Sequence, residues 1–284
     1  MTVWFDTGIK AGLTGEMVLD GTTHVIRAVA VDRDAIETLE GIDESLTGDE
    51  LEAEVDSRLR VLQFASALES AFIGTPVDIS ANLSLDAASG EIRCSPITLG
   101  QLSGNDSEYL LVFRDTGDLA TSPMLTVQDV AIHPNGASIW GVRLEGDKLL
   151  GYAAAGLFPR TLGKLFSGAE SLSGATLNVQ LLTAAPAYTE EFRSAVGNAV
   201  APLVSVSGFL LADAEAALVP DEASSVFSAV TGTLSHVLLS IDKGSAAADL
   251  PLGTMQISPA LTLTDGEYTL TYPAEGALRF AAVA

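Results

Sequence analysis

Two aspartates in similar tripeptides are the residues whose type and spacing could do chemistry in this sequence. Asp115 opens an Asp-Thr-Gly tripeptide and Asp242 opens an Asp-Lys-Gly tripeptide. Two carboxylates that share a proton can activate a water molecule for hydrolysis. A two-part site of that kind needs a small hydroxyl residue after both aspartates, and Lys243 replaces it in the second tripeptide. We therefore interpret both tripeptides as turns. In the first, Asp115 can accept backbone hydrogen bonds and Gly117 can adopt a positive φ, while Gly244 ends the second.

The other candidates for chemistry lack the spacing that a reaction or a metal requires. His24, His133 and His236 are not arranged like metal ligands, and no serine lies in a nucleophile-elbow pattern. Carboxylate clusters lack the spacing of an EF-hand loop, and no glycine-rich phosphate loop is present. Cys94 is the single cysteine, so neither an internal disulfide nor a cysteine zinc site can form. We expect no catalytic, cofactor-binding or metal-binding residues, and therefore no enzyme.

The composition predicts a soluble protein with a strongly negative surface. The 284 residues include 37 Asp and Glu but only 14 Lys and Arg, for a net charge of −23. Such a field repels phosphate backbones, so we expect no nucleic-acid partner. Hydrophobic residues make up 48% of the chain. The apolar runs are nevertheless far shorter than the roughly 18 residues of a membrane span. We expect neither a membrane partner nor a signal peptide.

An internal repeat surrounds the two tripeptides. Each tripeptide follows an apolar strand, at 110–113 and at 237–241. Each then leads through a loop of small residues to a second strand that opens with a proline, Pro123 or Pro251. The two regions therefore predict the same strand–turn–strand unit.

Further signals recur in the same order in both copies. The Asn-Gly pair ending at Gly136 and the Asp-Gly pair ending at Gly266 predict type I′ hairpin turns, because both tolerate positive φ. Each copy also opens with a short helical turn before a strand of alternating apolar residues, at 24–31 and at 176–182. Several matches in one order indicate two diverged copies of one β-rich unit.

The copies divide the chain into two expected domains. We place the boundary near residues 154–158, which gives a first domain over 1–154 and a second over 155–284. The predicted fold class is mainly β (α+β), with two tandem antiparallel β-sandwich-like domains that each carry short helices.

The first copy is longer in its middle, and the excess coincides with an expected amphipathic helix over 48–73. Thr47 and Glu50 form a capping-box pattern before an apolar stripe that ends near Gly74. The opposite face of this helix is acidic. The helix either packs on the sheet of its own domain with its acidic face in solvent, or contacts a neighbouring subunit.

The central motif of the first copy resembles a known family. Residues 113–124 read Phe-Arg-Asp-Thr-Gly-Asp-Leu-Ala-Thr-Ser-Pro-Met. This stretch is similar to the "Y-x-D-T-G-x-x-A-T-S-P-L-I" stretch of small structural proteins encoded by tailed phages and prophages. Residues 174–189 resemble the opening strand of the same family, while the second copy keeps only Asp242, Gly244 and Pro251 near its central motif. The motif residues of the first copy are Asp115, Thr116, Gly117, Ser122 and Pro123.

The resemblance implies a virion component made in the host cytoplasm. We expect a decoration or cement protein on the exterior of the capsid, with other virion proteins as partners and a homo-oligomer within a symmetric assembly. A neck, tail or baseplate adaptor that anchors fibres is the alternative within that class. A carbohydrate- or receptor-binding module is the alternative of another class, and exposed aromatic residues lining a groove would mark it.

Overall fold

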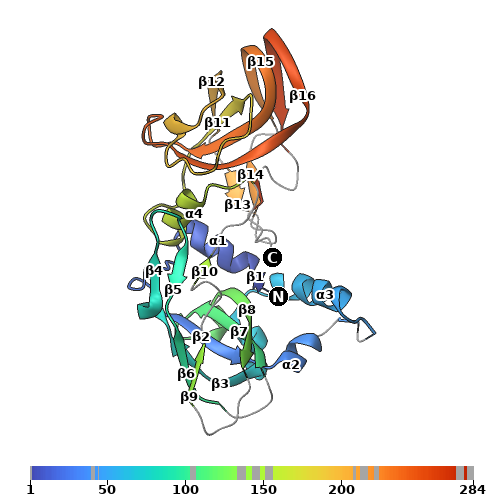
Figure 1. Ribbon diagram of the computed structural model, residues 1–284, viewed down its shortest axis with the longest axis vertical. Helices are drawn as coiled ribbons and strands as arrows, with labels where there is room; N and C mark the ends of the chain where they lie inside the picture. Colours follow the sequence, from blue (N-terminus) through green and yellow to red (C-terminus); the bar gives the residue numbers. More distant parts are fainter. Residues whose placement is uncertain are drawn as a thin grey trace.

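The computed structural model describes residues 2–39, 42–43, 45–102, 107–132, 139–142, 148–150, 156–206, 209–211, 217–220, 224–272 and 278–279. Antiparallel strands dominate these residues and the helices are short, which confirms the predicted mainly β (α+β) class. Figure 1 shows two β-rich units along the long axis of the molecule, with helices α1 (Asp6–Thr14) and α4 (Pro159–Phe166) between them.

The first unit contains a five-stranded antiparallel sheet with the strand order β1-β8-β7-β2-β3. Alternate residues of one strand enter two different cores, because side chains of a strand point to opposite faces. Leu110 and Val112 face the core that joins the two units, whereas Leu111 and Phe113 face the core beneath helix α3 (Asp49–Arg60). The strands of this sheet are β1 (Thr2–Trp4), β2 (Ile26–Val31), β3 (Phe72–Asp78), β7 (Ser107–Arg114) and β8 (Met124–Ile132).

The second unit contains a four-stranded antiparallel sheet with the order β12-β11-β15-β16. Strand β11 lies between β12 and β15 as β2 lies between β3 and β7, and β15 pairs with β16 as β7 pairs with β8. The four strands of the second sheet therefore have the same order as β3, β2, β7 and β8 of the first. The strands of the second sheet are β11 (Leu177–Leu182), β12 (Ala199–Val206), β15 (Ser224–Ile241) and β16 (Leu250–Thr271).

The smaller sheets of the two units also correspond to each other. The first unit has a three-stranded sheet of order β10-β5-β4 and the second has one of order β13-β14-β17. The first unit also has a two-stranded sheet, β6 with β9, whereas the single long strands β15 and β16 continue through the corresponding part of the second unit. The bounds are β4 (Leu83–Leu85), β5 (Ile92–Cys94), β6 (Ile97–Gln101), β9 (Ile139–Val142), β10 (Lys148–Leu150), β13 (Phe209–Leu211), β14 (Ala217–Pro220) and β17 (Leu278–Arg279).

Pairing register also agrees between the units, down to the position of a β-bulge. In the first unit the register shifts between Val112 and Phe113, and Phe113 lies opposite Met124. In the second unit it shifts between Leu239 and Ser240, and Ser240 lies opposite Pro251. Pro251 thus corresponds to Met124 and not to Pro123. The predicted equivalence of Pro123 and Pro251 is therefore wrong by one residue.

The predicted helix over 48–73 is wrong in its length. Helix α3 ends at Arg60, and residues 65–71 form a separate 3₁₀ helix before β3 begins. The backbone leaves the helical path because Ala65 N donates to Ser122 O and Met124 N donates to Gln63 O, bonds that tie this segment to the motif loop. The capping box is also absent, because Gly48 is the N-cap of α3 and no side chain caps the helix.

Two predicted hairpin glycines have different outcomes. Gly266 does not lie in a hairpin turn: it lies inside β16 opposite Val230, where the pairing register shifts. Asp265 takes the positive φ of 47° there, and its backbone N–H donates to Thr231 Oγ1. An Asp-Gly pair suits a bulge as well as a turn, because both need a residue that tolerates positive φ. Gly136 lies outside the described residues.

The two units meet through equivalent elements. Leu19 N donates to Phe166 O at 2.7 Å, and Leu172 N donates to Leu13 O at 2.9 Å. Leu13 and Phe166 each lie two residues before a glycine of positive φ, Gly15 and Gly168, that follows the helix. A reciprocal pair of contacts of this kind is the signature of an isologous, two-fold interface. The units are therefore related by a pseudo-two-fold axis. The predicted boundary at 154–158 falls partly outside the described residues.

Candidate functional site

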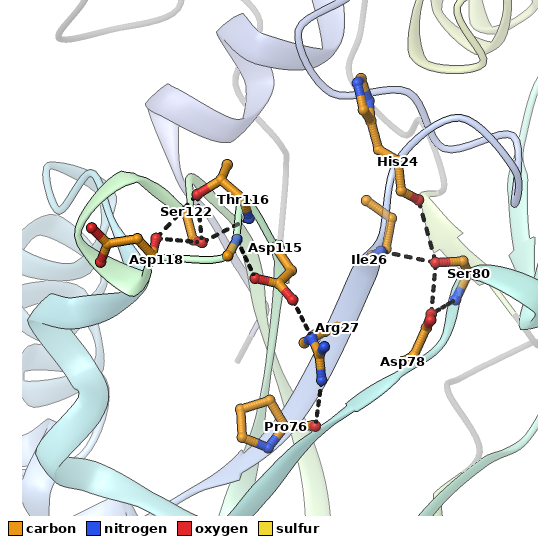
Figure 2. Close-up of polar contacts among 11 residues, drawn as sticks. His24, Ile26, Arg27, Pro76, Asp78, Ser80, Asp115, Thr116, Asp118 and Ser122 are labelled. Atoms are coloured by element: carbon orange, nitrogen blue, oxygen red, sulfur yellow. Dashed lines mark hydrogen bonds and ion pairs between the residues drawn. The ribbon is translucent and has the colours of Figure 1, made fainter.

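The Asp-Thr-Gly motif of the first unit forms a closed turn between β7 and β8 (Figure 2). Gly117 has a φ of 89°, which allows its backbone N–H to reach Asp115 Oδ1 at 2.8 Å. The backbone N–H of Asp115 donates to Val25 O at the edge of β2. The motif thus fixes where β7 ends and anchors that end on the neighbouring strand.

Ser122 closes the other side of the loop from a buried position. Its Oγ accepts from the N–H of Thr116 at 3.1 Å and donates to Asp118 O at 2.8 Å. Thr116 Oγ1 and Thr121 Oγ1 are 2.7 Å apart. Pro123, just before β8, forms an isolated antiparallel β-bridge with Phe64. The hydroxyl groups of the motif are therefore used to hold the loop itself.

Arg27 connects the motif to the neighbouring strands, as Figure 2 shows. Its Nε lies 2.5 Å from Asp115 Oδ2, and its Nη1 donates to Pro76 O at 3.1 Å. The hydrogen bond from the Gly117 N–H, and then Arg27, hold the pKa of Asp115 below its ordinary value despite partial burial. Hydrogen bonds from Ser80 lower the pKa of Asp78 on the same side of the sheet.

The second motif folds into the same turn with different polar groups. Gly244 has a φ of 86° and donates its N–H to Asp242 Oδ1 at 2.8 Å. The backbone N–H of Lys243 donates to Asp249 Oδ1 at 2.7 Å. Asp249 thus accepts the hydrogen bond that Ser122 accepts from the Thr116 N–H in the first motif. Pro251 lies within β16. Both motif aspartates are thus bound within their own turns.

Asp249 is the most enclosed carboxylate of the described residues, with 0% of its surface exposed. Its Oδ2 accepts from Arg193 Nε at 2.8 Å and from Asn178 Nδ2 at 3.1 Å. Burial raises the pKa of this carboxyl, but the Lys243 N–H, Arg193 and Asn178 outweigh burial and leave the pKa lowered. The second turn is therefore built around a buried ion pair.

Sequence reasoning found both turns but missed the residues that cross-link them. Arg27 and Asn178 occupy the same position, one residue after the start of β2 and of β11, and each contacts the motif loop of its unit. The sequence does contain a signal for these two residues: a polar residue occupies the same position in two otherwise apolar strands. Asp249 had no such signal, because its partner Arg193 lies far away in the sequence.

His24 has a structural role in the observed arrangement, because its ring accepts a backbone hydrogen bond. Its Nδ1 accepts the backbone N–H of Val18 at 2.9 Å, which requires an unprotonated nitrogen. Burial, and then the positive charge of Arg114, lower the pKa of His24 below its ordinary value. The ring is therefore held in the neutral form in which it accepts this hydrogen bond.

Among the described residues, no group of three or more His, Cys, Asp and Glu side chains could hold a metal ion. In the same part of the chain, no helix is both long enough and apolar enough to cross a bilayer. The exposed large hydrophobic residues that the structure describes are all aliphatic, and Trp4 is buried. Other described aromatic side chains, such as Phe64, Tyr188 and Tyr268, are half-buried.

We expect the free energy of unfolding to fall as the pH is lowered below the ordinary aspartate pKa of about 3.9. The folded-state pKa values of Asp115 and Asp78 are depressed, so their stabilisation is complete above that pH and is lost as the pH falls through the folded values. Asp115→Asn should cost about 1 kcal/mol at pH 7 and much less near pH 2, since the pair with Arg27 is partly exposed.

Urea titrations followed by circular dichroism at several pH values would measure this effect. Glu267→Gln, which removes an exposed carboxylate of β16, is the matched control. An Asp115→Asn variant with an unaltered difference between pH 7 and pH 2 would refute the assignment of this carboxylate.

No protein-family model, curated protein or solved structure was found to match the chain.

Proposed function

We propose that this chain is a structural component of a tailed-phage particle, and that it lies on the exterior of the capsid as a decoration or cement protein. The resemblance of the motif around Asp115 to phage structural proteins supports the class. The turn that the motif forms also fits a structural role, because its carboxylate and hydroxyl groups bind the loop and the neighbouring strands.

The observation that carries the proposal is the pseudo-two-fold pairing of two equivalent units. Leu13 and Phe166, with Leu19 and Leu172, make reciprocal hydrogen bonds across the junction. A chain of this form presents two similar surfaces in a fixed relation. Such a chain can bridge two equivalent sites of a symmetric lattice, and capsids are lattices of that kind.

The net charge supports an exterior position. A charge of −23 makes contact with packaged DNA unfavourable, whereas it keeps an outer surface soluble. The partners in this proposal are the capsid protein and further copies of the chain. The described aromatic side chains are buried or half-buried, so they give the carbohydrate-binding alternative no specific support.

Immunogold electron microscopy of particles from the phage or prophage that encodes the chain tests the proposal. We expect label over the whole head, together with loss of packaged DNA at lower temperature from particles that lack the chain. Recombinant protein added back should restore the release temperature. Label confined to the neck or tail would instead support the adaptor function, and absence from purified particles would contradict a virion role.

A further inference from the structure

The segment that follows α1 makes one of the two reciprocal hydrogen bonds between the units. Leu19 N donates to Phe166 O at 2.7 Å. The neighbouring Val18 packs against the turn that follows α4, where a Cβ added to Gly168 would lie 2.8 Å from Val18 Cγ1. Val18 and Leu19 are both buried. A displacement of this segment therefore acts directly on α4 and on the second unit.

His24 fixes this segment to the first unit. The backbone N–H of Val18 donates to His24 Nδ1 at 2.9 Å. The backbone oxygen of His24 in turn accepts from Ser80 Oγ at 3.3 Å, as Figure 2 shows, and β2 begins two residues later. The imidazole thus connects the sheet of the first unit to the segment that contacts the second unit.

This connection exists in only one protonation state of the imidazole. A neutral ring has one nitrogen that accepts, whereas an imidazolium ring carries a proton on both nitrogens. Turning a protonated His24 ring therefore cannot restore an acceptor for the Val18 N–H. A partly buried donor that loses its acceptor destabilises the arrangement that held it.

Two charged groups act on the imidazole in opposite directions. Burial, and then Arg114, lower the pKa of His24, whereas Asp20 raises it. Desolvation raises the pKa of Asp20, but hydrogen bonds from Thr23 and Thr22 outweigh it and keep this carboxylate ionised. The net result is a His24 pKa below the ordinary value. The stabilisation that depends on the neutral ring is therefore complete above about pH 6.5 and is lost as the pH falls through the lower, folded-state value.

The second unit has an alanine at the place of this histidine. The backbone oxygens of Val25 and Thr176 each accept the N–H of the motif aspartate in their own unit. The residues before them, His24 and Ala175, are therefore equivalent. Leu172 makes the reciprocal bond of the junction on this side without an imidazole. The fold at this position thus does not require a histidine, and protonation acts on one side of the junction.

We propose that His24 is a pH-sensitive link that controls one side of the junction between the units. At neutral pH the imidazole holds the segment of Val18 and Leu19 against α4. In acid the imidazole binds a proton, the Val18 N–H is released and the hydrogen bond from Leu19 loosens. The reciprocal bond from Leu172 remains, so the junction opens as a hinge on one side. The proposal does not depend on the virion role.

Amide hydrogen exchange of the full chain, corrected for the intrinsic effect of pH, tests this proposal. A change from about pH 7.5 to about pH 4.5 crosses the ordinary histidine pKa, whereas Asp115 and Asp78, with their lowered pKa values, keep their charge. Ring ¹⁵N shifts report when His24 is protonated. The protection of the Val18 and Leu19 amides should then fall by about fivefold, as expected for one lost hydrogen bond. The Leu172 amide should keep its protection.

Three variants separate the imidazole from other effects of acid. His24→Asn keeps an acceptor oxygen that does not titrate, so protection at Leu19 should stay high at both pH values. His24→Leu has no acceptor, and protection at Leu19 should be low at both. His236→Asn removes a histidine that contacts Ser235, and should respond to pH as the unaltered chain does.

Three results would each overturn the proposal. The first is unchanged protection at Leu19 once the His24 ring is protonated. The second is an equal loss at Leu19 and Leu172, which would indicate a general loosening. The third is a His24→Asn variant that still responds to acid. The first two use the unaltered chain, so they do not depend on how well a variant folds.

Discussion

Asp249→Ala is expected to lower the free energy of unfolding by about 3–5 kcal/mol, the typical cost of removing one partner from a buried ion pair. Asp249 is fully enclosed, and its loss leaves Arg193 with only 12% of its side chain exposed and no carboxylate. The N–H of Lys243 and the amide of Asn178 also lose their acceptor. Urea denaturation at pH 7, followed by circular dichroism, measures the change.

Ser122→Ala is the matched control, because Ser122 fills the equivalent place in the first unit with a neutral hydroxyl. Its loss should cost only about 1–2 kcal/mol, the usual value for a neutral hydrogen bond with a buried group left unpaired. The loss of unfolding free energy in Asp249→Asn should lie between those of the two variants, since asparagine keeps an acceptor oxygen but not the charge. Equal losses for Asp249→Ala and Ser122→Ala would contradict the importance of the buried charge.

Gly12→Ala should destabilise the protein by about 1–3 kcal/mol, because the junction between the units has no room for an added methyl group. A Cβ at Gly12 would lie 2.2 Å from Cε1 of Phe166, whose ring is itself buried. Phe166 belongs to α4 and Gly12 to α1, so the clash would push apart the two helices at the pseudo-two-fold junction. Thermal and urea unfolding both report the loss.

A double-mutant cycle separates this clash from a general effect of changing a helix. Phe166→Ala alone should cost about 3–5 kcal/mol. In that background Gly12→Ala should be nearly neutral, since the ring that it would meet is gone. Gly197→Ala lies outside the helices and has open space around the added methyl group, so it controls for the addition of a methyl group without a clash. The same cost for Gly12→Ala in both backgrounds would rule out the close approach as the cause.

The pseudo-two-fold pairing explains why the junction is built so tightly. Equivalent helices meet there, and each unit completes the core of the other: Leu13 and Leu19 of the first share one cluster with Phe166 and Leu172 of the second. A shared core of this kind keeps the units in a fixed relation, whereas two domains joined by a linker are expected to move.

Local sequence determined the mainly β class, the two turns and the strands that flank them. The strands expected at 24–31 and 176–182 appear as β2 and β11, because alternating apolar residues encode a strand with little help from the rest of the chain. Asp115 with Gly117, and Asp242 with Gly244, form the turns because an aspartate and a glycine two residues later suffice to close them.

Contacts between distant segments decided the features that sequence reasoning got wrong. The apolar stripe at 48–73 is continuous, but hydrogen bonds to Ser122 and from Met124 divert its second part into a 3₁₀ helix. The Asp-Gly pair at Gly266 forms a bulge and not a hairpin because Val230 lies opposite it. Neither partner is adjacent in sequence, so no local pattern could reveal the choice.

The sequence by itself predicts one β-rich unit in two copies, since short stretches of residues encode each strand, turn and following strand. Only the tertiary structure decided how the units face each other, that Asp249 binds Arg193, and that His24 accepts the N–H of Val18. The physical reason is range: turn and strand propensities act over a few residues, whereas packing and ion pairing join groups that chain folding alone brings together.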